Sequence, residues 1–200
     1  MTVPPRDRRD PMLAVTEADL VARARSGDMA AFEELVMAYA DRLFAVLLRL
    51  LGDRAEAEDV AQEVMLRAWR GIGRFRGNSS FFTWLYRIAV NEANRSLQKA
   101  ARRPLTVPVE TGTPQIPADA RDEPARRAEQ QELRAALAGA LASLPPDYRA
   151  AIVLRDIEGL STKEAADITG VGQAAFKSRL HQARLRVRTA VGDDALVSAG

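Results

Sequence analysis

The sequence predicts an all-α protein made of two small helical domains joined by a flexible linker. Apolar residues recur every three or four positions through most of the chain, which is the spacing of helices that bury one face. No segment shows the strict alternation typical of a β-strand. The proline-containing stretch 104–124 interrupts the helical pattern and is longer than the roughly 12–15 residues usual for a loop inside one domain.

The first two helices are predicted from capping residues and apolar spacing. Thr16, followed by Asp19, is expected to cap a short first helix, and residues 1–15 are expected to be disordered. A long second helix is expected to begin at Asp28, because apolar side chains then repeat at helical intervals. It is expected to end at Gly52, since glycine readily takes the left-handed conformation of a helix end.

Two further helices are predicted before the linker. Asp53, with Glu56 three residues later, predicts the start of a third helix that reaches about Arg70. Three glycines then mark a loop: Gly71, Gly73 and Gly77. Ser80 predicts the start of a fourth helix that extends to about Arg102.

Four helices are expected after the linker. The first begins near Ala125 and is broken by LPPDY, and the second spans Tyr148 to Ile157, with Pro146 suited to its first turn and Gly159 ending it. A short helix from Ser161 to Thr169 and a longer one from about Gln173 to Val191 follow. The tail, 192–200, is expected to be disordered. The predicted domains are therefore residues 16–103 and 125–191, with the linker 104–124 between them.

The composition excludes several classes of protein. The chain has no cysteine, which rules out disulfides and thiolate metal sites. Its start, MTVPPRDRRDP, lacks the apolar segment of a secretory signal, and no run approaches the roughly 18 apolar residues of a membrane span. It also has no phosphate-cradling glycine loop, metal-ligand spacing or nucleophile motif. We therefore expect a cytoplasmic protein without membrane insertion, catalytic activity, metal or cofactor.

Charge is unevenly distributed although the net charge is only +2. Between Asp53 and Glu63 there are five acids and one arginine, whereas Gln173 to Val191 carries five lysines and arginines and no acid. Segregation of this kind predicts two different partners, one basic and one acidic. The alternative is that these helix faces merely carry solvated charge.

The segment STKEAADITGVGQAAFKSRLHQARLRVR has the layout of a helix-turn-helix motif. Ser161 and Glu164 predict a capping box, and Gly170 suits the turn. The inward face is expected to comprise Ile168, Val171, Phe176, Leu180 and Val187. The second helix then carries side chains suited to base edges and phosphates, namely Lys177, Ser178, His181, Gln182, Arg184 and Arg188. These features favour binding in the DNA major groove, and a solvated or protein-binding basic helix is the alternative.

The helix after Ser80 is predicted to have one apolar and one polar face. Trp84 lies beside Leu85 and Ile88, which favours a core position over stacking on a base. The polar face carries donors for nucleic acid: Arg87, Asn91, Asn94, Arg95 and Gln98. Ahead of the helix, the small polar loop GNSS can receive an extruded base while the basic stripe holds the backbone of a single strand.

Three stretches of the chain resemble the signature segments of bacterial sigma factors of the extracytoplasmic-function (ECF) group. They are AEDVAQEVMLRAWR, FRGNSSFFTWLYRIAVNEANR and DYRAAIVLRDIEGLSTKEAADITGVGQAAFKSRLHQARLRV. The segments occur in the family's order and spacing, and the resemblance covers about Thr16 to Val191. Three motifs in register are far more specific than a single helix-turn-helix match.

The resemblance implies a subunit that recruits RNA polymerase core to promoters. In the family, the N-terminal domain (sigma region 2) binds the β′ clamp, melts the minus-ten element and captures a flipped base of the non-template strand. The C-terminal domain (sigma region 4) reads the minus-thirty-five element and rests on the β flap. An anti-sigma factor, often membrane-bound, holds many relatives inactive and is a further candidate partner.

Carried over by position, the resemblance implies three sets of site residues. The surface for the polymerase clamp would comprise Asp59, Gln62, Glu63 and Arg67. The minus-ten site would comprise the loop residues Asn78, Ser79 and Ser80 with the helix residues Arg87, Asn91 and Asn94. The minus-thirty-five site would comprise Lys177, Ser178, Arg179, His181, Gln182 and Arg184.

The chain departs from the family pattern at several positions. Met65 stands where phenylalanine is usual, a conservative change in a packed site. Gly172 replaces a proline, and Ala174 and Ala175 replace a Gly-Thr pair at the start of the second helix of the motif. Gln182 stands where an arginine is common. We expect these departures to affect which bases are read, while DNA binding itself remains.

Two alternatives stay open on the sequence. The linker acids Glu110, Asp119, Asp122 and Glu123 would mimic nucleic acid in the basic RNA channel of polymerase, or belong to an ordinary tether. The chain as a whole could also be a stand-alone helix-turn-helix regulator whose N-terminal domain senses a ligand or dimerises. That interpretation leaves the Asn/Arg face of the fourth helix unexplained.

Overall fold

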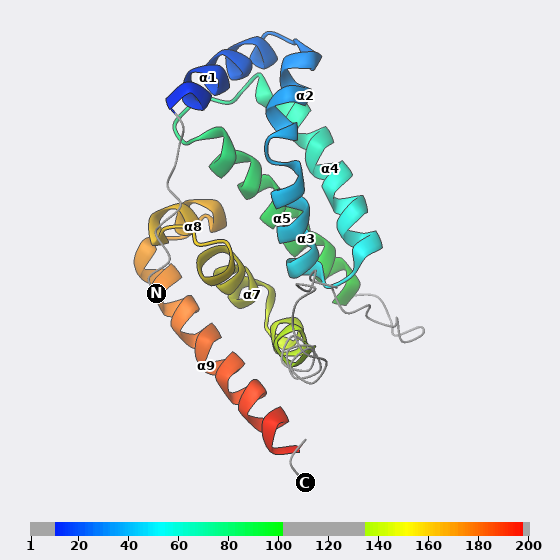
Figure 1. Ribbon diagram of the computed structural model, residues 1–200, viewed down its shortest axis with the longest axis vertical. Helices are drawn as coiled ribbons and strands as arrows, with labels where there is room; N and C mark the ends of the chain where they lie inside the picture. The colour runs from blue at the N-terminus through cyan, green and yellow to red at the C-terminus, as the bar shows by residue number, and fades with distance from the viewer. Residues whose placement is uncertain (1–10, 102–134, 198–200) are drawn as a thin grey trace, which may run out of the picture.

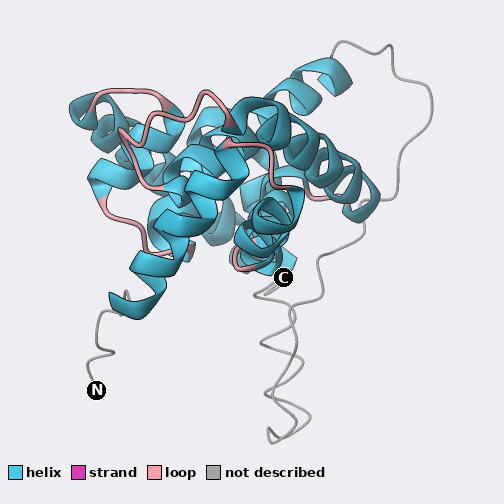
Figure 2. Cartoon of the chain, turned by 90° about the horizontal axis from the view of Figure 1, so that it is seen from above, coloured by secondary structure: helices cyan, strands magenta, loops and turns pink. Residues whose placement is uncertain are grey.

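The computed structural model describes residues 11–101 and 135–197, and every regular element in these ranges is a helix (Figures 1 and 2). The prediction of an all-α fold is therefore confirmed. The predicted linker 104–124, with its acids Glu110, Asp119, Asp122 and Glu123, lies outside the described residues, as do residues 1–10 and the helix start expected near Ala125.

Five helices form the N-terminal half. They are α1 (Pro11–Arg25), α2 (Met29–Met37), α3 (Ala40–Leu51), α4 (Arg54–Ile72) and α5 (Phe81–Ala101). Helix α1 packs on α2, while α3, α4 and α5 pack against one another. Their core contains fully buried leucines such as Leu43 and Leu47, each of which contributes about 1.5–3 kcal/mol by leaving water. Thr16 lies inside α1, so the predictions of a cap at that residue and of disorder up to residue 15 are wrong.

The single long helix predicted from Asp28 to Gly52 is also wrong, because the chain bends between α2 and α3. The backbone of Tyr39 has φ −119° and ψ −8°, and its N–H donates to the carbonyl oxygen of Val36 at 2.9 Å. The Tyr39 hydroxyl donates to the Glu17 carboxylate, and its ring contacts Phe81 and Phe82 on α5. Tertiary contacts of one tyrosine thus accompany the bend.

The predicted helix ends at Gly52 and Asp53 are confirmed. Gly52 adopts φ +79° at the end of α3, and a carboxylate oxygen of Asp53 accepts a hydrogen bond from the N–H of Glu56 at 2.7 Å. Asp28 caps α2 in the same way, through the N–H of Ala31 at 3.1 Å. This hydrogen bond, with a contribution from Arg23, holds the pKa of the Asp28 carboxyl below its usual value.

The C-terminal half contains residues 135–143, which are helical, followed by α7 (Pro146–Ile152), η1 (Val153–Ile157), α8 (Thr162–Thr169) and α9 (Gln173–Val197). Pro146 occupies the first turn of α7, as predicted, and the chain continues into the π-helical turn η1 without a break. Helix α9 begins at the predicted residue but runs to Val197. The tail expected to be disordered from residue 192 is therefore helical up to that point.

The two halves pack against each other, although we expected separate bodies. Helix α8 contacts α5, and η1 contacts α3, so that α7, α8 and α9 gather on one side of the α1–α5 bundle (Figure 1). Buried side chains of both halves, among them Leu43 and Ile168, belong to one continuous hydrophobic cluster. This packing decides which of the candidate site residues are accessible.

Candidate nucleic-acid interfaces

Helices α8 and α9 form the predicted helix-turn-helix motif. The Ser161 hydroxyl accepts a hydrogen bond from the N–H of Glu164 at 3.2 Å, and the Glu164 carboxylate accepts one from the N–H of Ser161 at 3.0 Å. Both halves of the capping box are therefore present. Gly170 turns the chain with φ +71°. Of the predicted inward face, Ile168, Phe176 and Leu180 are buried, and Val171 and Val187 are partly buried.

The outward face of α9 is polar and accessible. Four of the residues predicted to read the minus-thirty-five element are exposed there: Lys177, Ser178, His181 and Gln182. They lie within two turns at the N-terminal end of α9, the part of a recognition helix that meets base edges. The surface offers a cation, a hydroxyl, an imidazole and an amide, so it can pair with phosphates and with donors and acceptors of bases.

The other two predicted residues, Arg179 and Arg184, form ion pairs within the C-terminal half. Arg179 lies 3.2 Å from the carboxylate of Asp147. Arg184 donates two hydrogen bonds to Asp156, at 2.8 and 2.6 Å, and this bonding raises the pKa of its guanidinium. Because a paired guanidinium must leave its carboxylate to reach DNA, these two residues are less available than the other four.

The polar face of α5 carries the predicted strand-binding residues. Arg87 and Asn91 are exposed and Asn94 is partly exposed. However, Nε of Arg87 donates to the main-chain carbonyl oxygen of Asp167 on α8 at 3.0 Å. The helix-turn-helix motif thus lies against the face that was predicted to grip a single strand.

The loop 78–80 projects from a base of packed aromatic rings. Phe75, before the loop, packs on Phe81 and Trp84 after it, with ring centroids 6.2 and 5.2 Å away. Ser80 caps α5, as predicted, because its hydroxyl accepts the N–H of Thr83 at 3.2 Å. Asn78 is exposed and Ser79 partly exposed. The rings fix the two ends of the loop and leave the Asn78 amide free to contact a base.

The outer face of α4 carries the residues predicted to bind polymerase. Asp59 and Gln62 are exposed. Glu63 accepts a hydrogen bond from Arg67 at 2.6 Å, one helical turn away. Arg67 also lies 3.3 Å from the buried carboxylate of Glu92 on α5, which pairs with Arg95 at 2.8 Å.

Sequence reasoning missed a basic groove between α4 and α5. The groove encloses about 440 Å³ and is lined by Arg67, Arg70, Gly71, Arg74, Trp84, Ile88, Asn91, Glu92 and Arg95. Trp84 is partly buried there, so it serves the aromatic base of the loop and the groove at once. A sequence signal did exist, because Arg67, Arg70 and Arg74 are spaced three and four residues apart, which places them on one side of the chain.

The described residues contain no group of three or more histidine, cysteine, aspartate or glutamate side chains arranged to hold a metal ion. Within the same ranges, no helix is both long and apolar enough to cross a membrane.

Comparisons with known proteins match both halves of the chain. Residues 21–103 match the family model for Sigma-70 region 2, and residues 134–187 match that for Sigma-70 region 4. Among solved structures, CnrH in complex with the cytosolic domain of CnrY is 27% identical, with a TM-score of 0.65 over 90% of this chain and 99% of that chain. The sigma factor RpoE of Bartonella quintana, solved with the anti-sigma factor NepR, is 25% identical, with a TM-score of 0.64 over 80% of this chain and 96% of that chain.

Curated relatives agree with these matches. The RNA polymerase sigma-H factor of Pseudomonas aeruginosa is 35% identical over 84% of this chain and 90% of that protein. The ECF RNA polymerase sigma-E factor of Escherichia coli K12 is 35% identical over 85% of this chain and 91% of that protein. The chain therefore belongs to the ECF group of RNA polymerase sigma factors, the subunits that bind polymerase core and direct promoter-specific initiation of transcription.

Proposed function

We propose that the outer face of α9 reads the minus-thirty-five element in the major groove of duplex DNA. The observation that supports this most directly is the exposure of Lys177, Ser178, His181 and Gln182 on one accessible face of the second helix of a fully capped helix-turn-helix. Arg179 and Arg184 contribute after they exchange Asp147 and Asp156 for phosphates. Gln182 suits an adenine edge, whereas an arginine at that position would suit guanine.

The polar face of α5 and the loop 78–80 hold the melted non-template strand of the minus-ten element. Asn78, Ser79 and Ser80 receive an extruded base, and Arg87, Asn91 and Asn94 contact the strand beside it. The groove between α4 and α5 extends this path, since its guanidinium groups can pair with phosphates and Trp84 can stack on a base. Stacking of this kind stabilises a bound strand by about 1–3 kcal/mol per base.

The outer face of α4 docks on the clamp of the polymerase β′ subunit through Asp59, Gln62, Glu63 and Arg67. The protein then acts by binding alone, as a non-enzymatic subunit, in the cytoplasm where polymerase and promoters are. Unstacking a base costs a few kcal/mol, and the loop pocket, the stacked tryptophan and the paired phosphates offset this cost without nucleotide hydrolysis.

We also propose an anti-sigma factor as a regulatory partner. The support is by likeness: CnrH was solved with the cytosolic domain of CnrY, and RpoE of Bartonella quintana with the anti-sigma factor NepR.

Run-off transcription with a bacterial polymerase core on a genomic library tests the proposed function. We expect start sites preceded by two sequence blocks, one for each DNA face. Core that initiates equally with and without the protein would contradict the proposal. Binding to a symmetric operator as a dimer would instead identify a stand-alone regulator.

Three sets of variants assign the surfaces in the same assay. Asp59→Ala with Gln62→Ala should abolish association with core, and wild-type affinity would contradict the role of α4. Lys177→Ala with Ser178→Ala should weaken only the upstream block. Asn78→Ala should change the preferred downstream base and leave core binding intact, and an unchanged preference would refute the assignment of the loop.

A further inference from the structure

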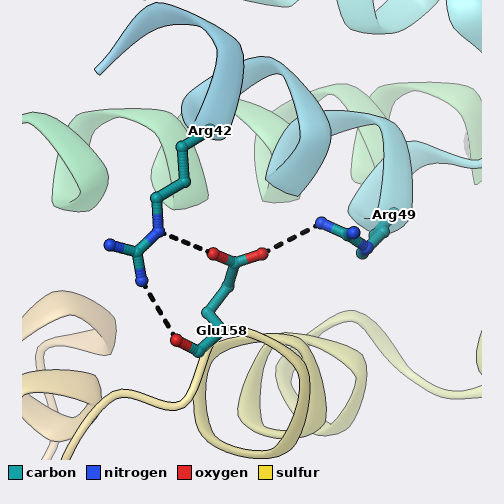
Figure 3. Close-up of polar contacts among 3 residues, drawn as sticks. All are labelled: Arg42, Arg49 and Glu158. Carbon is teal, nitrogen blue, oxygen red and sulfur yellow. Dashed lines mark hydrogen bonds and ion pairs between the residues drawn. The ribbon is translucent and has the colours of Figure 1, made fainter. Parts of the chain in front are cut away.

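One carboxylate joins the two halves of the molecule. Glu158 follows η1 in the C-terminal half, and its side chain is only 8% exposed. One of its oxygens accepts from Arg42 at 2.8 Å and the other from Arg49 at 2.9 Å, both on α3 (Figure 3). Arg42 also donates to the main-chain carbonyl oxygen of Glu158 at 3.0 Å. The acid is thus gripped from both sides and at its backbone.

The arginine receptor is already positioned on the N-terminal half. The guanidinium of Arg42 lies over the ring of Phe82 on α5, 5.1 Å from its centroid. Arg42 and Arg49 are seven residues apart, two turns along the same face of α3. Their side chains remain 47% and 31% exposed, so water and salt can reach the cations while the acid between them is covered.

The same closed arrangement covers the strand-binding face. With η1 held on α3, α8 contacts α5, and Arg87 spends its Nε donor on the carbonyl oxygen of Asp167. The reading residues Lys177 and Gln182 on α9 remain exposed. A strand that needs Arg87 and the space beside it must therefore displace α8.

We propose that Glu158, Arg42 and Arg49 form a latch that holds the two halves closed and keeps the strand-binding face of α5 covered by α8. Release of Glu158 from α3 lets α8 move away from α5, and Arg87 then becomes available to the opened strand. This inference rests on the proposed function in one respect, the assignment of α5 to the strand. The latch itself is a property of the free protein.

Distances measured in the free full-length chain test the latch directly. The native chain has no cysteine, so Asp19→Cys on α1 and Thr189→Cys on α9 accept spin labels at two chosen sites only. Electron–electron resonance should give one narrow distance distribution for the doubly labelled parent. Glu158→Arg should add a longer, broader component and raise the open fraction at least tenfold, because it sets three cations against one another. The matched control is Glu34→Arg, an exposed acid on α2 away from the junction.

A charge swap and a second pair of variants remove the remaining ambiguity. Glu158→Arg combined with Arg42→Glu and Arg49→Glu should restore the narrow distribution. If Glu158→Arg fails to fold, Arg42→Gln with Arg49→Gln changes only partly exposed side chains and should open the molecule in the same way. Closed distances in a folded Glu158→Arg or in the double glutamine variant would overturn the latch.

The coupling to strand binding is measured separately. The probe is a fluorescent single strand carrying the downstream block found by run-off transcription. Its association rate should rise in the latch variants in proportion to the open fraction. Variants that open without faster association would overturn the claim that closure covers the strand face. Failure of the wild-type protein to direct initiation would instead overturn the proposed function, whatever the distances show.

Discussion

The two candidate DNA faces differ in what lies against them. On α9, Lys177 and Gln182 are exposed, while on α5 Arg87 is bonded to the backbone of α8. Helix α8 is common to both faces, because it orients α9 through the turn at Gly170 and packs on α5 with its other side. A surface for duplex DNA can therefore stay open while the surface for a single strand is held back, in one conformation of one chain.

The difference arises from how the smaller half is attached. Its buried Arg149, only 7% exposed, donates to the carbonyl oxygens of Ala142 and Leu144 in its own half and of Leu50 at the end of α3. Burial lowers the pKa of this guanidinium. The same side chain thus organises the C-terminal half and ties it to the N-terminal half, which makes it the first place to break the comparison.

The largest effect is expected for Arg149→Ala. The substitution leaves three buried carbonyl groups without their donor and opens a cavity, so the free energy of unfolding should fall by about 3 kcal/mol. Urea denaturation followed by circular dichroism measures this loss. Arg155→Ala, which changes a partly exposed arginine in η1, is the control and should stay within about 0.5 kcal/mol of wild type. Equal losses for the two variants would show that the bridge contributes nothing to the closed arrangement.

The sequence predicts those features whose signals are local. The caps at Asp53 and Ser161 and the left-handed glycines Gly52 and Gly170 depend on residues within one turn, and all four are where the sequence places them. The exposed side chains on α9 follow in the same way from helical spacing. Helix capping and amphipathic faces need no knowledge of the remaining chain.

The features that sequence reasoning misses depend on distant partners. The apolar spacing runs unbroken past Tyr39, but that residue bonds to Glu17 and packs on rings of α5, where the chain bends. Glu158 lies 116 residues from Arg42, and no local pattern signals such a pair. Arg149 reads as one more charged residue of a short helix, although it is buried. These contacts bring the two halves together, and for that reason the covering of Arg87 could not be predicted.

A second prediction compares the two faces through one cation on each. Arg87→Ala should weaken binding of the single strand about tenfold and lower the salt dependence of that binding by about one counterion. Lys177→Ala should do the same for the duplex upstream block and leave the single strand unaffected. Fluorescence anisotropy over a salt series measures both effects.

The arginine variant carries an additional signature. Because Arg87 also bonds to Asp167 on α8, its loss should increase the open fraction in the spin-label experiment, whereas loss of Lys177 should not. If both variants weakened single-strand and duplex binding alike, the separation of the two faces would be wrong.

The smallest effect is expected for Ser161→Ala, at the start of the helix that the two faces share. The substitution removes the hydroxyl that accepts the N–H of Glu164, and the loss of such a cap lowers the free energy of unfolding by about 1 kcal/mol. Ser161→Thr keeps the acceptor and should recover most of the loss. Since α8 supports α9 and covers α5, a loosened α8 should weaken duplex binding and speed single-strand association in the same protein. Two effects of the same sign would mean that α8 does not couple the faces, and the contrast between them would then be a matter of exposure alone.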